Sequence, residues 1–169
     1  MADPKWLSAG EREAWLVFAE VMMREMAALD SQLQRDCGLS HFEYGILAGL
    51  SEAPGGTLQM SLLAEMANGS LSRLSHAVKR LEERGWVRRA PNPGDGRLTD
   101  AILTGAGREK IAASAPGHVA QVRRLVIDPL TPEQLEQLRG IGLSMLDALD
   151  ATEATERPGW AFPRRPGRR

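Results

Sequence analysis

The chain has 169 residues, of which 43% are hydrophobic and 25% are charged, and its formal net charge is −1. This composition is typical of a globular protein with one compact core, and the balanced charge excludes a uniformly basic coat for nucleic acid. The sequence has neither an apolar run of about 20 residues nor a secretory signal pattern, so we expect a cytoplasmic protein with no membrane partner.

Residues 11–36 are predicted to form a long amphipathic helix, because their apolar side chains recur at spacings of three and four. The apolar stripe consists of Trp15, Phe18, Met22, Met26, Leu29 and Leu33. Val17, Val21 and Met23 are also apolar but lie off this stripe, which indicates that a partner chain covers a second side of the helix. Gly38 is expected to end it.

Two shorter helices are predicted next. Ser40 and Glu43 have the spacing of a capping box, and the breaker run Ala53–Gly56 ends the helix that they begin. Thr57–Met60 is expected to be a short linker with a single bridge of strand. Ser61 is then expected to cap a short helix through its side chain.

A fourth helix, capped by Ser70 and ended by Gly85, follows a tight turn at Asn68–Gly69. Its apolar residues are expected to face the core, and they are Leu71, Leu74, Ala77, Val78 and Leu81. Its opposite side is polar and basic, and comprises Ser72, Arg73, Ser75, His76, Lys79 and Arg80. The helix is therefore amphipathic, with a face suited to an anionic partner.

A β-hairpin is predicted after this helix. Trp86–Ala90 and Leu98–Leu103 are short runs suited to strands, and the loop between them is rich in Pro, Gly, Asn and Asp. In that loop Asp95 and Arg97 are separated by a single glycine, a spacing that allows carboxylate and guanidinium to pair. We expect Asp95 to hold Arg97 in place.

Two long helices are predicted in the C-terminal part. Thr104 caps the first, which the Pro116–Gly117 pair is expected to kink or interrupt and Asp128–Pro129 to end. Thr131 caps the second, with a proline at its first helical position. Residues 152–169 are rich in Pro, Gly and Arg, so we expect a disordered basic tail.

The order of short helix, tight turn, polar helix and hairpin predicts a winged helix-turn-helix, in a mainly α fold with a small β-hairpin wing. Residues 70–97 contain seven basic and three acidic residues, a local charge of +4. An α-helix fits the major groove of B-DNA, and an arginine at a wing tip suits the narrow minor groove. The residues expected to contact duplex DNA are Ser70, Ser72, Arg73, Ser75, His76, Lys79, Arg80, Asp95 and Arg97.

The motifs resemble those of the MarR family of bacterial transcription regulators. The similarity rests on the segment from Leu63 to Val87, on Asp95-Gly96-Arg97 and on the Leu103–Gly107 run. The resemblance implies a homodimer that regulates transcription, as a repressor, from a pseudo-palindromic operator. It also implies a helical dimerisation region in residues 1–39 and 105–151, and a DNA-binding domain in residues 40–104.

Many members of that family respond to an anionic aromatic effector in a cleft between the dimerisation helices and the winged helix. The resemblance therefore implies an effector site, for which Trp15, Met22, His41 and Tyr44 are the candidates. Their apolar character and helical spacing by themselves favour core packing for most of them. Cys37, the sole cysteine, is expected to be a structural thiol, with an intersubunit disulfide as the alternative.

An enzyme is not expected, because the sequence has no phosphate-binding glycine loop, nucleophile elbow or metal-ligand cluster. We therefore expect neither a metal nor a cofactor. The alternative function is a winged helix that contacts proteins without specific DNA readout. The basic side of the fourth helix disfavours that alternative.

Overall fold

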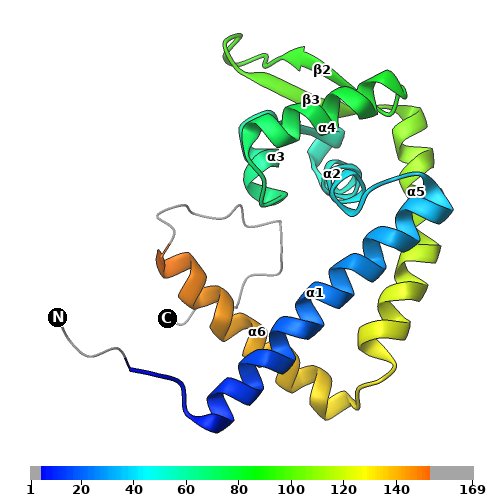
Figure 1. Cartoon of the computed structure of the whole chain (residues 1–169). Helices are drawn as coiled ribbons and strands as arrows, with labels where there is room; N and C mark the ends of the chain where they lie inside the picture. Colours follow the sequence, from blue (N-terminus) through cyan, green and yellow to red (C-terminus); the bar gives the residue numbers. More distant parts are fainter. Residues whose placement is uncertain (1–4, 153–169) are drawn as a thin grey trace.

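The computed structural model describes residues 5–152, which contain six α-helices and a small sheet; the sheet lies at one end of the molecule, beside α3 and α4 (Figure 1). The elements are α1 (Ala9–Cys37), α2 (His41–Glu52), the 3₁₀ turn η1 (Pro54–Gly56), β1 (Thr57–Gln59), α3 (Met60–Met66), α4 (Leu71–Glu83), β2 (Val87–Pro91), β3 (Thr99–Leu103), α5 (Gly105–Val122), the π-helical turn η2 (Arg123–Ile127) and α6 (Pro132–Thr152). The predicted mainly α fold with a β-hairpin wing is confirmed. The predicted tail lies outside the described residues, apart from Thr152 at the end of α6.

The winged helix is a compact lobe in which α2, α3 and α4 pack beside an antiparallel sheet of order β1-β3-β2 (Figure 1). Leu58 pairs with Ala101 across β1 and β3, and Val87 pairs with Leu103 across β2 and β3. The expected bridge at Thr57–Met60 is thus a strand of three residues. Fully buried side chains fill this lobe, among them Ile46, Leu47, Leu50, Leu63, Leu74, Val78 and Leu81.

Local caps set most helix starts. The Ser40–Glu43 capping box begins α2, Ser70 accepts a bond from the amide of Arg73 at the start of α4, and Thr104 caps α5, all as predicted. The predicted Ser61 cap is wrong: the residue before α3 is Gln59, so the helix begins two residues earlier than expected, with no side-chain cap. Met60 directly follows β1, and its side chain is buried in the core. This burial explains the difference, because it makes Met60 the first residue of α3.

Leu71 is not a core residue, contrary to the prediction, because 55% of its surface is exposed. It is the first residue of α4, and the buried stripe of this helix begins nearly one turn later, at Leu74. A residue at the free end of a helix can share the apolar period without reaching the layer against which the helix packs.

The interruption predicted at Pro116–Gly117 is also wrong, since α5 continues through Pro116 to Val122. Proline lacks an N–H, so the bond to the carbonyl of Ala112 is missing. Both residues are exposed, and water can satisfy that carbonyl without a break in the helix. The irregular turn lies further on, at η2.

Helices α1, α5 and α6 extend away from the winged helix (Figure 1). Helix α5 packs against both α1 and α2 and thereby joins the two parts. Reciprocal bonds between Thr131 and Gln134 begin α6, as predicted. Within residues 5–152, none of the helices combines the length and the apolar character needed to cross a membrane.

Candidate nucleic-acid interface

Helix α4 presents a polar outer stripe to solvent. Ser72, His76 and Lys79 are exposed on it, and they lie opposite the buried residues of the same helix. Ser70 is exposed directly before the helix, and its hydroxyl accepts the amide of Arg73 at 3.2 Å. Ser75 is half-buried at the edge of the stripe. These predicted contact residues therefore share the start and the outer side of one helix.

The Arg73 guanidinium lies 4.2 Å from the centre of the Phe42 ring, in a cation–π contact. Phe42 belongs to the first turn of α2, and its ring also packs on Gly69 so closely that a Cβ there would lie 3.0 Å from it. A side chain at position 69 would therefore press on the Phe42 ring, and the ring limits the freedom of Arg73 before any ligand binds.

Arg80 is bound to Glu43 of α2. Its Nε donates to Glu43 Oε1 at 2.8 Å, while the amide of Ser40 donates to the other carboxylate oxygen at 3.0 Å. Burial raises the pKa of Glu43, but the bond from Ser40 and the bonds and charge of Arg80 outweigh it, so the pKa lies below its usual range. The carboxylate is ionised and Arg80 is half-exposed beside it.

Several other bases counted from the sequence also have partners within the fold. Arg84 donates to the carbonyl of Gly38 at 2.7 Å and lies over the Trp86 ring. Arg89 makes two side-chain bonds to Glu82. Glu82 is already counted in the local charge of +4 and the Gly38 carbonyl is neutral, so of these partners only Glu43, outside residues 70–97, offsets a further positive charge. The seven bases are not equivalent in their freedom to meet a ligand.

The predicted pair at the wing tip is confirmed. Arg97 Nε lies 3.2 Å from Asp95 Oδ1, and the backbone amide of Arg97 donates to the same oxygen at 3.0 Å. Arg97 is 91% exposed, so the rest of its guanidinium is free to meet a ligand. The carboxylate fixes the base of the side chain and leaves its end in solvent.

Sequence reasoning missed the support beneath this tip. Asn92 Oδ1 accepts the amides of Gly94 and Asp95, and Asn92 Nδ2 donates to both oxygens of the buried Asp100. The first two bonds are typical of an asparagine turn, which the Asn-Pro-Gly-Asp order indicates. The bond to Asp100 depends on the hairpin register and has no local signal.

The wing is also fixed relative to α4. The hydroxyl of Thr104 donates to the carbonyl of Gly85 at 2.7 Å, and the amide of Thr104 donates to the carbonyl of Trp86. A Cβ on Gly107 would collide with that same Trp86 carbonyl. Glycine at 107 therefore lets α5 start against the turn between α4 and β2, which holds the base of the wing at the C-terminal end of α4.

The four residues proposed for an effector site do not lie together. His41 and Tyr44 are half-buried beside His118 of α5, with ring centres 5.8 and 4.3 Å from that of His118. Trp15 instead contacts Phe18 on the far half of α1. His118 was missed because its partners precede it by more than 70 residues, beyond the reach of any helical spacing.

Burial is the main influence on the ionisable groups of the His41–Tyr44–His118 cluster. Burial lowers the pKa of His118, and nearby His41 lowers it further; burial also lowers the pKa of His41, although Asp30 and Glu25 oppose this. Burial raises the pKa of Tyr44, which therefore keeps its proton. Nδ1 of His118 is buried without a hydrogen-bond partner in the described part of the chain. The neutral imidazoles are favoured here.

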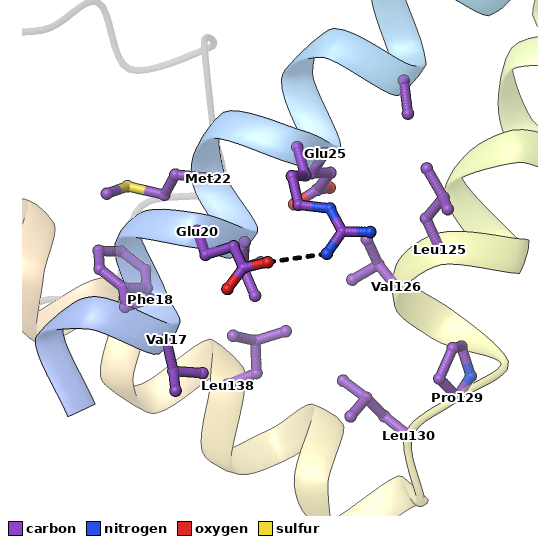
Figure 2. A pocket seen from close by; sticks show the side chains of 13 residues that line it. Val17, Phe18, Glu20, Met22, Glu25, Leu125, Val126, Pro129, Leu130 and Leu138 are labelled. Carbon is purple, nitrogen blue, oxygen red and sulfur yellow. Dashed lines mark hydrogen bonds and ion pairs between the residues drawn. The ribbon is translucent and has the colours of Figure 1, made fainter. Parts of the chain in front are cut away.

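Met22 lines a different feature, an apolar cavity of about 610 Å³ between α1, η2 and α6 (Figure 2). Figure 2 shows Phe18, Val17 and Leu138 on one side and Leu125, Val126 and Leu130 on the other, with Glu20, which pairs with Arg24, between them. Neither His41 nor Tyr44 lines it.

The described residues contain no group of three or more His, Cys, Asp or Glu suited to a metal ion, and Cys37 is a free, half-buried thiol.

Comparison with known proteins places this arrangement among transcription regulators. A model of the MarR family matches residues 38–98. The structure of Sco3205, a MarR family transcriptional regulator from Streptomyces coelicolor solved in complex with DNA, superposes with a TM-score of 0.85 at 45% identity, over 94% of this chain and 100% of that one.

Two further relatives agree. AbsC, another MarR family transcriptional regulator from Streptomyces coelicolor, superposes with a TM-score of 0.83 at 38% identity, over 88% of this chain and 99% of AbsC. The HTH-type transcriptional regulator YdcH of Bacillus subtilis is 31% identical over 80 residues, which are 46% of this chain and span 54% of the length of YdcH.

Proposed function

The chain belongs to the MarR family of transcriptional regulators, and we propose that it represses transcription by binding, as a homodimer, to a pseudo-palindromic operator in duplex DNA. The resemblance inferred from its motifs is thereby confirmed, and the chain is a regulator and not an enzyme. The observation that carries the proposal is the pairing of the exposed polar side of α4 with the solvent-exposed Arg97 at the tip of the adjacent wing.

The two elements suit the two grooves of DNA. The start of α4, with its serines and Arg73, enters the major groove, where arginine recognises guanine and serine bonds to either kind of base pair. Arg97 reaches the narrow minor groove beside it. Sco3205, which has the same fold at 45% identity, was solved in complex with DNA, and this supports DNA binding by the present chain.

The exposed apolar surface supports a second copy of the chain as the partner. No residue of α6 whose exposure is described is buried, although its apolar side chains form a continuous stripe. The exposed members of that stripe are Leu138, Ile141, Met145 and Leu149. Helix α1 exposes eight further large apolar side chains between Trp15 and Met26. Exposed apolar side chains gathered on neighbouring helices in this way are typical of surfaces that become buried in homodimers.

We also propose that a small anionic aromatic effector releases the protein from DNA. It binds beside His41, Tyr44 and His118, where α2 of the winged helix meets α5 of the dimerisation region. The phenol and an imidazole N–H can donate to a carboxylate, and the unpartnered Nδ1 of His118 is a polar group that a ligand can satisfy. Its binding would change the contact between the two regions.

Selection of duplexes from a random-sequence library, followed by footprinting of the enriched duplex, tests the proposal. We expect two symmetric half-sites whose centres lie about one helical turn, roughly 34–36 Å, apart. A variant with Ser72, Arg73 and His76 all replaced by Ala serves as the control and should enrich no common sequence. Failure of the wild-type protein to enrich any sequence would instead favour a winged helix that contacts proteins.

A further inference from the structure

Exposed large apolar side chains are rare in the winged helix. Within residues 40–104, all of which the structure describes, the residues of this kind are Leu71 and Leu98. All the others lie on residues 6–26, on α5 or on α6, where a second copy of the chain is proposed to cover them. Leu71 and Leu98 are outside that region, so dimer formation does not account for them.

Both leucines lie on the elements proposed to meet DNA. Leu98 follows Arg97 at the wing tip, and its backbone closes the wing turn by donating to the carbonyl of Asp95. Leu71 is the first residue of α4, between the exposed Ser70 and Ser72. It is followed one turn later on the same side by Ser75. The start of a recognition helix is the part that approaches base edges most closely.

Leu71 therefore adds an apolar contact to an otherwise polar reading surface. Its side chain has no hydrogen-bonding group, so it cannot read the donors and acceptors of a base. One apolar group is presented in the major groove, the 5-methyl group of thymine. We propose that Leu71 contacts a thymine methyl group in each half-site and so makes this regulator select thymine at that position.

This inference rests on the proposed function, and it adds a base preference that the serines, Arg73 and Arg97 do not supply. Burial of one methyl group between a leucine and the groove corresponds to a change in affinity of about fourfold. An effect of this size is measurable for one position in an operator. It disappears when either the thymine methyl or the leucine side chain is removed.

The test is a double-mutant cycle between protein and DNA. The probe is the duplex enriched by selection with the wild-type protein, together with copies in which one symmetric pair of thymines at a time is replaced by deoxyuridine, which lacks only the methyl group. Dissociation constants are measured for the wild type, Leu71→Ala and the matched control Leu98→Ala. Both leucines are exposed, so both variants are expected to fold, and circular dichroism verifies this.

We expect one thymine pair at which deoxyuridine weakens binding by the wild type and Leu98→Ala several-fold, and leaves binding by Leu71→Ala unchanged. Equal losses for the wild type and Leu71→Ala at every position would overturn the inference while leaving DNA binding intact. Enriched duplexes without any methyl-sensitive position would overturn it too. If no duplex is enriched at all, the proposed function itself fails, which is a distinct outcome.

Discussion

Glu43 of α2 and Arg80 of α4 form an ion pair, with 2.8 Å between Oε1 and Nε, in which the carboxylate is buried and the guanidinium is half-exposed. The same carboxylate completes the capping box of α2 through Ser40. One side chain thus joins the start of α2 to the DNA-facing helix. Arg80 acts first as a positioning residue for α4, and its free edge faces solvent.

Replacement of Glu43 by Gln is expected to destabilise the fold by about 1–3 kcal/mol, because charge-assisted bonds to Arg80 and to the amide of Ser40 become neutral or are lost. Urea unfolding at pH 7 measures the change. Glu83→Gln is the matched control, since Glu83 is exposed and 4.0 Å from Lys79, and it should change stability by less than about 0.5 kcal/mol. Equal effects of the two variants would contradict the assigned role of Glu43.

The stability of the wild type should depend on pH through this carboxylate. The pKa of Glu43 is lower in the folded state than the ordinary value of 4.5, so its contribution is complete above that value and is lost as the pH falls through the folded-state pKa. Glu43→Gln should remove part of the acid sensitivity below pH 4.5. An unchanged slope of unfolding free energy against pH would argue against this.

Arg73 is expected to read one base pair. Arg73→Ala should reduce discrimination at a single operator position by about 1–3 kcal/mol, as measured by competition between the selected duplex and its single-base variants. Phe42→Leu keeps Arg73 but removes the ring on which it stacks, and should weaken specific binding about two- to fivefold. Loss of affinity spread evenly over all positions in Arg73→Ala would show that this residue binds phosphate instead.

Arg97 is expected to supply affinity more than sequence preference, because an arginine in the minor groove responds chiefly to groove width and potential. Arg97→Ala should weaken binding to all tested duplexes by a similar factor, on the order of tenfold. Asp95→Asn, which loosens Arg97 without removing it, should have a smaller effect. Arg139→Ala on α6, where Arg139 pairs with Glu136, is the control and should bind DNA normally.

Dimer formation is expected to depend on the apolar stripe of α6. The wild type should have a mass of twice 18.5 kDa by light scattering at micromolar concentration. Leu138→Asp places a charge at the cavity between α1 and α6 and should produce a monomer or an unfolded chain. Gly140→Asp, on the opposite side of the same helix, where an added Cβ meets no atom within 4 Å, should remain a dimer. A monomeric wild type would rule out the proposed assembly.

The histidine cluster is expected to make the fold less stable in mild acid. The pKa values of His41 and His118 lie below the ordinary value of 6.5 in the folded state, so the unfolded chain binds protons more readily. Stability should therefore be complete above pH 6.5 and fall as the pH drops below it. His118→Gln should reduce this dependence in urea unfolding between pH 5 and 7. His76→Gln, at an exposed position on α4, should preserve it.

The sequence by itself determined the elements and the family, because these depend on short-range chemistry. Caps at Ser40, Ser70 and Thr131 mark helix starts through bonds to amides within three residues, and an apolar period marks each helix. The Asp95–Arg97 pair was predictable for the same reason, since its partners are two residues apart.

Only the tertiary structure decided which side chains of those elements are free to act. Arg80 meets a glutamate 37 positions earlier, and His118 meets two rings of α2, through packing that no local period specifies. Leu71 obeys the apolar period of α4 yet lies beyond the layer that buries the rest of the stripe. Burial depends on where neighbouring elements end, and that is a property of the assembled fold.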